Sequence, residues 1–324
     1  MINMKLTIVG SLAYDTIFTD SGEAKDIIGG SAIYAGISAV NHLRRSGVEY
    51  ENQIGLVGVI GSDFQDNDLS KLRQQGLDLS GVITSSGNTF RWIGRYRGDM
   101  SEAETIETHL NVFANFTPTI PDHFTTPEIV FCANMHPNLQ LSVLDQIRPE
   151  SFSALDSMNL WIQTERDSLS NVLSRVDMAI LNENEVKLIS GRTDLFESAS
   201  LIQNGEALSG NNSDKSGPKF IIIKRAANGA IALTPDGFIE SPSCDNVTLI
   251  DPTGCGDSFA GALLSHLAIS HKNGDSFDKN SIKNALSHAN VTASFTLSSF
   301  GVDSLINIDD DSYSSRFQQY ESNL

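Results

Sequence analysis

Short runs of apolar residues recur along the chain, each bounded by glycine or by a polar turn. Runs of about four to eight such residues are typical of strands that are buried on both faces. They occur at residues 6–9, 54–60, 129–133, 153–156, 178–181, 220–223 and 230–233. Helical periodicity lies mostly between them, at residues 28–43, 69–75, 139–147, 169–176 and 283–297. This alternation predicts an α/β fold with a mostly parallel central sheet flanked by helices.

Two segments, 11–27 and 88–116, interrupt the alternation of strands and helices. Residues 89–96 alternate between apolar and polar positions, which is typical of a half-exposed strand. We expect both segments to supply strands of a small β lid over the carboxyl edge of the main sheet. The lid would be inserted into a single domain that spans residues 1–324. The polar stretch 203–218 is predicted to be a surface loop.

The charge balance narrows the classes of partner. The chain has 324 residues, with 40 acidic and 22 basic side chains and a formal net charge of −18. Such a surface repels nucleic acids and anionic membranes, so we expect neither as a partner. The three cysteines, Cys132, Cys244 and Cys255, lack metal-ligand spacing and are expected to be reduced thiols. No apolar signal core or membrane-spanning run is present, which predicts a cytoplasmic protein.

The segment Asp251-Pro252-Thr253-Gly254-Cys255-Gly256-Asp257 carries the clearest chemical signal. It precedes a helical pattern of apolar residues, and its two glycines leave backbone N–H groups uncrowded at the mouth of that helix. Such a terminus is an anion site, and residues 254–257 are called the anion hole below. Asp257, in the first turn, is placed to take a proton from a hydroxyl that attacks a phosphoryl group held there. The structural alternative is a capping aspartate in an ordinary first turn.

The segment 251–262, DPTGCGDSFAGA, resembles the carboxyl-terminal signature of the ribokinase family, also called the PfkB family of carbohydrate and nucleoside kinases. Four further segments resemble the family's motifs in the same order. They are the substrate-binding opening at 10–15, the glycine pair Gly29-Gly30, the segment 58–64 and the N-x-x-E motif at 182–185. The resemblance covers nearly the whole chain and implies a ribokinase-like three-layer fold with ATP as phosphoryl donor.

The resemblance also implies roles for the residues that stand at the family's functional positions. The implied groups are substrate-binding Asp15, Gly29, Gly30 and Tyr34; nucleotide-binding Asn182, Glu185, Lys224, Gly229, Ser299 and Gly301; and catalytic Gly254, Cys255, Gly256 and Asp257, with Asp257 as the general base. Glu185 would hold Mg²⁺ through water, and a monovalent cation, K⁺, would lie near Asp251 and Thr253. Asn182 and Glu185 also fit an ordinary helix cap, and Asp15 also fits a turn cap. A homodimer formed through the lid is compatible with the resemblance.

Two positions depart from the family pattern. Tyr34 stands where the family often has an asparagine that touches a sugar hydroxyl, which argues against a ribokinase-like preference for ribose. Lys224-Arg225-Ala226 replaces a T-x-G turn, and Lys224 is long enough to reach a phosphate.

Three functions therefore remain open. The first is an ATP-dependent kinase that phosphorylates a hydroxymethyl group of a small sugar or polyol. The second is an adenosine-like nucleoside kinase, for which Tyr34, Trp92 and Phe113 offer stacking surface. The third is a non-catalytic sugar- or nucleotide-binding regulator, against which the intact Asp257 argues. The sequence does not name the acceptor, and it leaves Arg91, Trp92, Asp156 and Asn159 without a role.

Overall fold

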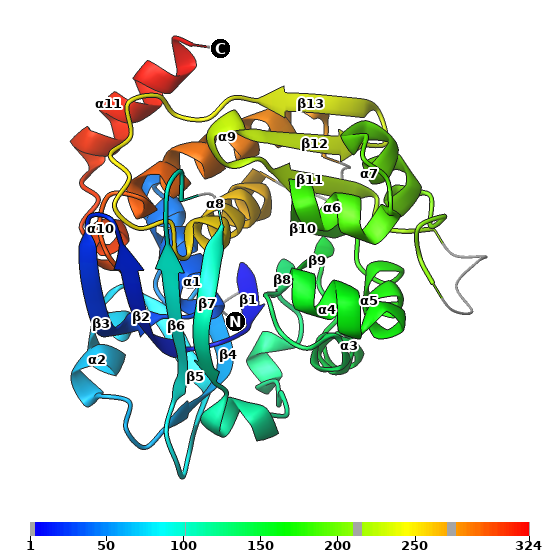
Figure 1. Cartoon of the computed structure of the whole chain (residues 1–324). Coiled ribbons are helices and arrows are strands. Elements are labelled where there is room, and N and C mark those ends of the chain that lie inside the picture. The colour runs from blue at the N-terminus through cyan, green and yellow to red at the C-terminus, as the bar shows by residue number, and fades with distance from the viewer. Residues whose placement is uncertain (1–3, 101, 210–215, 271–276, 324) are drawn as a thin grey trace.

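A nine-stranded sheet forms the centre of the protein (Figure 1). The computed structural model describes residues 4–100, 102–209, 216–270 and 277–323. In spatial order the strands are β13 (Gly237–Ser241), β12 (Ala230–Thr234), β11 (Phe220–Lys224), β10 (Met178–Asn182), β9 (Phe152–Asp156), β8 (Ile129–Cys132), β1 (Leu6–Val9), β4 (Ile54–Gly61) and β5 (Leu77–Ser85). All neighbours from β11 to β5 pair in parallel, and β12 is antiparallel to both of its neighbours.

The apolar runs form strands because both faces of the sheet are covered. Every residue of β1, β4, β8, β9 and β12 is buried. The predicted mostly parallel sheet is thereby confirmed. The strands β5 and β13 were not assigned from the sequence. They lie at the two edges of the sheet, where one face is partly exposed and the continuous apolar run gives way to a mixed pattern.

Helices pack on both faces of the sheet and make a three-layer fold. One face carries α1 (Ser31–Arg45), α2 (Asp66–Gln74), α8 (Cys255–Ser270), α9 (Lys279–Thr296), α10 (Asp303–Ile306) and α11 (Asp310–Glu321). The other carries α3 (Pro137–Gln146), α4 (Asn159–Thr164), α5 (Arg166–Leu173), α6 (Glu183–Ser190) and α7 (Leu195–Gln203). Both α2 and α9 begin earlier than the apolar periodicity indicated, because their first turns are polar.

Four strands form a second sheet, called the lid. They are β3 (Gly22–Gly29), β2 (Ala13–Thr19), β6 (Phe90–Tyr96) and β7 (Ala103–His109), in this spatial order. The strands β2 and β6 run parallel, with Asp15 opposite Trp92 and Tyr14 opposite Arg91. Since side chains alternate between the faces of a strand, Asp15 and Trp92 share one face of the lid, and Tyr14 and Arg91 share the other.

The Tyr14 face ties the lid to the body of the protein. The Tyr14 hydroxyl donates to Asp68 Oδ2 at 2.6 Å, and the Tyr14 ring stacks on Phe64 at 5.0 Å between centroids. The Arg91 guanidinium donates to Asp63 Oδ2 at 2.9 Å. These contacts leave the Asp15 face directed toward the carboxyl edge of the main sheet.

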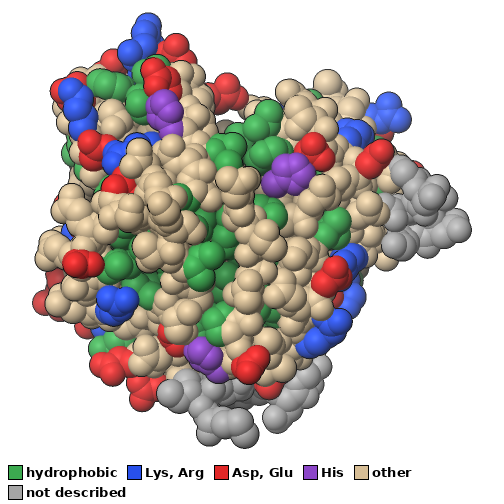
Figure 2. All heavy atoms as spheres, turned by 90° about the horizontal axis from the view of Figure 1, so that it is seen from below, with side chains coloured by type: hydrophobic (Ala, Val, Ile, Leu, Met, Phe, Trp, Pro, Cys, Tyr) green, Lys and Arg blue, Asp and Glu red, His purple; other side chains and the backbone are tan. Residues whose placement is uncertain are grey.

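Three remaining observations concern the surface charges, the helices and one predicted loop. On the face shown in Figure 2, basic side chains lie toward the rim, interspersed with acidic ones. Among the described residues, no helix is long and apolar enough to cross a membrane. The predicted loop at 203–218 includes residues 210–215, which lie outside the described residues.

Candidate active site

The loop before α8 is held in one conformation by a buried carboxylate. Asp251 is fully buried, and its two oxygens accept the N–H groups of Thr253 at 2.9 Å and Gly301 at 3.3 Å. Gly254 has φ +72°, a region that favours glycine. A side chain there would also collide with the ring of Tyr34, which packs directly on Gly254. The loop therefore presents a fixed helix N-terminus at the carboxyl edge of the sheet.

Asp257 lies in the first turn of α8, as predicted. Burial, followed by the negative charge of Asp156, raises the pKa of its carboxyl to about 7, while Lys224 acts in the opposite direction. A carboxyl group with a pKa close to neutrality is suited to accept a proton and to release it again.

Asp15 lies in the lid strand β2, and its carboxyl group packs against Gly29 so closely that no side chain fits there. The residue is 4% exposed. Burial, together with the charges of Asp251 and Asp257, raises the pKa of Asp15 to about 8, and the N–H group of Gly30 opposes the rise. The structure thus brings Asp15 and the glycine pair together beside the anion hole.

Tyr34, on α1, completes this part of the site. It is 1% exposed, and its hydroxyl has no hydrogen-bond partner among the described residues. Burial is the main cause that raises the pKa of this hydroxyl well above its usual range. The carboxylates of Asp15, Asp251 and Asp257 raise it further. A buried hydroxyl without a partner is suited to a polar ligand.

On the other side of the anion hole, Asn182 and Glu185 form a reciprocal helix cap. The Glu185 N–H donates to Asn182 Oδ1 at 2.8 Å, and the Asn182 N–H donates to Glu185 Oε2 at 2.6 Å. Glu185 is buried, and burial raises its pKa to about 7, against the effect of Lys224. A carboxylate has further lone pairs, so the cap leaves Glu185 able to accept from a metal-bound water. The residues present therefore fit water-mediated Mg²⁺.

Lys224 ends β11, and its Nζ donates to Asp156 Oδ2 at 2.9 Å. Burial lowers the pKa of Lys224, but the negative charges of Asp156 and Glu185 outweigh it and leave the pKa above its usual value. No role was predicted for Asp156 from the sequence. The available signal was its position at the end of β9, because the carboxyl ends of parallel strands meet at one edge.

Other predicted residues lie farther from this centre or are engaged locally. Gly229 lies in the turn between β11 and β12, and Ser299 Oγ accepts the N–H of Ser304 at 3.1 Å. The N–H group of Gly301 donates to Asp251, as described above. Phe113 packs between Phe90 and Phe116, at 5.7 and 5.6 Å between centroids. Asn159 is exposed at the start of α4.

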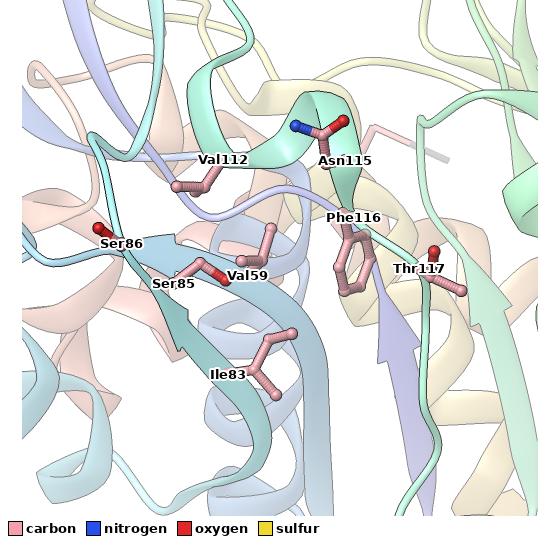
Figure 3. Close-up of a pocket in the computed structure, with 8 residues that line it drawn as sticks. All are labelled: Val59, Ile83, Ser85, Ser86, Val112, Asn115, Phe116 and Thr117. Carbon is pink, nitrogen blue, oxygen red and sulfur yellow. The ribbon is translucent and has the colours of Figure 1, made fainter.

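A cavity of about 270 Å³ lies outside this site (Figure 3). It is lined by Val59, Ile83, Ser85, Ser86, Val112, Asn115, Phe116 and Thr117. None of the predicted site residues lines it. Among the described residues, no group of three or more His, Cys, Asp or Glu side chains is placed to hold a metal ion directly.

The chain is similar to a known family and to several known proteins. The pfkB family of carbohydrate kinases matches residues 4–308. The cytidine kinase of Thermococcus kodakarensis is 27% identical over 269 residues, which cover 81% of this chain and 88% of that protein. The nucleoside kinase of Methanocaldococcus jannaschii is 22% identical over 275 residues, covering 81% and 82%.

Solved structures show the same fold. The ribokinase of Giardia lamblia superposes with a TM-score of 0.79 at 19% identity, covering 99% of this chain and 100% of that one. The M. jannaschii nucleoside kinase gives a TM-score of 0.72 at 18% identity, with 98% and 99% coverage. The expected ribokinase-like fold is thereby confirmed.

Proposed function

This chain belongs to the pfkB family of carbohydrate kinases, and we propose that it transfers the γ-phosphoryl group of ATP to a hydroxymethyl group of a small sugar, polyol or nucleoside. The observation that carries the proposal is the position of Asp257 in the first turn of α8, beside a loop fixed by Asp251. A base and an anion site at one helix terminus are what in-line phosphoryl transfer needs. This arrangement also argues against a non-catalytic regulator.

In the proposed reaction Asp257 accepts the proton of the acceptor hydroxyl. The acceptor oxygen then forms a bond to the γ-phosphorus, and the bond from that phosphorus to the bridging oxygen of ADP breaks. The amides of Gly254, Cys255 and Gly256 stabilise the charge on the transferring group, because a helix N-terminus carries a partial positive charge. Asp257 can later release the proton to solvent.

The nucleotide would be bound at the carboxyl ends of β10 and β11. Asn182 and Lys224 would contact its phosphates, and Gly229, Ser299 and Gly301 would line its pocket. Mg²⁺, held through water by Glu185, would neutralise phosphate charge.

A monovalent cation is proposed beside Asp251 and Thr253. Asp251 is fully buried, burial raises its pKa, and no basic side chain pairs with it among the described residues. A cation such as K⁺ would compensate that carboxylate and order the loop.

The acceptor would lie between the lid and the anion hole. Asp15 would accept hydrogen bonds from its hydroxyl groups, Tyr34 would donate to it, and Gly29 and Gly30 would leave it room. The nucleoside candidate is favoured by Trp92, which is half-buried and shares the lid face of Asp15. Its indole offers a flat apolar surface for a base, and the curated relatives are cytidine and nucleoside kinases.

A panel of sugars, polyols and ribonucleosides, including cytidine, would test the proposal. Each compound is incubated with ATP and Mg²⁺, ADP release is followed, and the product is located by phosphorus NMR. The Asp257→Asn variant serves as the matched control. We expect at least one compound to give acceptor-dependent ADP release and a phosphomonoester on its hydroxymethyl group. ADP release equal to that of Asp257→Asn for every compound would contradict the proposal.

Three further features belong to the same proposal. Residues 1–324 would act as one kinase domain with an inserted lid. The protein would work in the cytoplasm, where ATP is available. A homodimer through the lid is supported by β7, an edge strand whose seven residues are all exposed. Sedimentation of the parent protein at several concentrations would decide the last point.

A further inference from the structure

Lys224 and Asp156 form a buried ion pair that spans strand β10. Their strands, β11 and β9, lie on either side of β10 and end at the same edge of the sheet. The Lys224 Nζ and the Asp156 Oδ2 are 2.9 Å apart, and the two side chains are 17% and 7% exposed. Burying such a pair has a desolvation cost, so the pair is weak evidence of a role in stability.

The position of the Lys224 ammonium group indicates a role in the reaction instead. A Cβ atom built on Gly256 would lie 3.1 Å from Lys224 Nζ, so the ammonium group faces the first turn of α8. That turn contains the amides proposed to stabilise the transferring phosphoryl group. A positive charge at this point adds to the partial charge of the helix terminus, and the Lys224 side chain that carries it is mostly buried.

Asp156 is anchored independently of Lys224. Its Oδ1 accepts the N–H of Ser157 at 2.8 Å, and its carbonyl oxygen accepts from Gln140 Nε2 at 2.9 Å. Lysine has a flexible four-carbon stem, and an ammonium group on such a stem is poorly fixed unless something holds it. The carboxylate of Asp156 therefore fixes where the ammonium group lies.

We propose that Asp156 is a positioning residue, which holds the Lys224 ammonium group against the anion hole so that Lys224 stabilises the negative charge of the γ-phosphoryl group during transfer. This inference rests on the proposed kinase function. It gives Lys224 a catalytic role beyond ATP binding, and it makes Asp156 act on the transferring phosphoryl group only through Lys224.

The pair also acts on the proposed base. Asp257 is faced by Lys224 from β11, by Asp156 from β9, and by the carboxyl group of Asp15 from the lid. The hydroxyl of Tyr34 on α1 and the thiol of Cys255 on α8 also lie near it. Asp156 raises the pKa of Asp257 and Lys224 lowers it. Removing Lys224 should therefore shift the acid limb of the pH–rate profile to higher pH. Removing the charge of Asp156 should shift it to lower pH.

The test uses the full chain with ATP, Mg²⁺ and the best acceptor of the panel. The variants are Lys224→Met, Lys224→Arg, Asp156→Asn and the double variant Asp156→Asn/Lys224→Met. Lys219→Met and Asp177→Asn are the matched controls. These residues form a partly exposed pair at 3.4 Å, with Lys219 immediately before the other end of the same strand β11. Thermal melts confirm that each variant folds, and Lys224→Arg keeps the charge if the methionine variant does not fold.

We expect Lys224→Met to lower kcat by about 10²–10³-fold, the range for losing one donor to a transition-state charge. Asp156→Asn should lower kcat by about tenfold or more, with a much smaller change in the KM for ATP. The double variant should resemble Lys224→Met within about threefold, because Asp156 has no partner to position once Lys224 is removed. The acid limb should move to higher pH in Lys224→Met and to lower pH in Asp156→Asn. Both controls should match the parent.

Three outcomes would overturn the inference. They are losses in kcat that multiply in the double variant, acid limbs that move in the same direction, and an equal loss in the Lys219 and Asp177 controls. Calorimetric titration of the parent with the Mg²⁺ complex of a non-hydrolysable ATP analogue separates this failure from that of the kinase proposal. A parent that neither binds the analogue nor releases ADP would reject both, whereas an active parent with multiplicative losses would reject only the role of Asp156.

Discussion

Replacing Tyr34 by phenylalanine removes a single buried hydroxyl group. The residue is 1% exposed and its hydroxyl lacks a hydrogen-bond partner among the described residues. Leaving a buried polar group unpaired costs about 1–3 kcal/mol. The phenylalanine ring keeps its packing on Gly254, so the change should recover about 1 kcal/mol of that cost. The chain has 324 residues, and for a domain of that length a gain of this size raises Tm by roughly 1–2 °C.

The same hydroxyl is expected to donate to the acceptor during the reaction. Tyr34→Phe should therefore raise the KM for the acceptor by about tenfold, which corresponds to about 1.4 kcal/mol of lost binding. The KM for ATP should stay near the parent value. Higher stability together with lower affinity for the acceptor is expected when a polar group serves binding and lowers stability.

Tyr14→Phe is the matched control, because the Tyr14 hydroxyl is fully engaged. It donates to Asp68 Oδ2 at 2.6 Å and accepts the N–H of Gln65 at 3.0 Å. Its removal should lower stability by about 1–2 kcal/mol. Scanning calorimetry without added ligands, followed by acceptor titrations, measures both effects. A fall in Tm for Tyr34→Phe similar to that of Tyr14→Phe would refute the reasoning, and an unchanged acceptor KM would remove Tyr34 from the substrate site.

Three other predictions concern Asp257 and Asp15. Asp257→Asn should lower kcat by about 10²–10⁴-fold, as expected for loss of a general base, with little change in calorimetric ATP affinity; a parental rate would reject the base. Asp15→Ala should weaken acceptor binding by about tenfold or more and leave ATP binding unchanged, and equal acceptor dissociation constants would return Asp15 to a turn cap. The parent's kcat/KM should fall as the pH decreases through about 7, because Asp257, whose pKa is raised to about 7, must be ionised to accept a proton; a flat profile from pH 5.5 to 8 would contradict this.

Local parts of the site could be predicted from the sequence because they depend on neighbouring residues. The cap between Asn182 and Glu185 spans one helical turn, and its two hydrogen bonds form as the sequence indicated. Asp257 directly follows Gly256 and lies three residues after Gly254, so its place in the first turn of α8 depends only on where that helix begins. The edge strand β5 was missed because partial exposure mixes polar residues into its pattern.

Contacts between distant segments could not be predicted in the same way. Arg91 and Trp92 are adjacent in the sequence and carry similar signals, yet the register with β2 sends Arg91 to Asp63 and Trp92 to the face of Asp15. Lys224 finds Asp156 only because β9 and β11 both lie beside β10.

The layered α/β architecture can be inferred from the order of residues alone, because strands buried on both faces must be continuously apolar. The helix terminus that holds the anion hole can be inferred in the same way, because glycines and a cap act over a few residues. The tertiary structure decided which groups surround that terminus. Tyr34 contacts Gly254 because α1 packs on α8. Lys224 lies beside Asp156 and Gly256 because of the order of the strands in the sheet. The charges that set the pKa of Asp257 follow from those long-range contacts, so the chemistry of the base is a property of the fold.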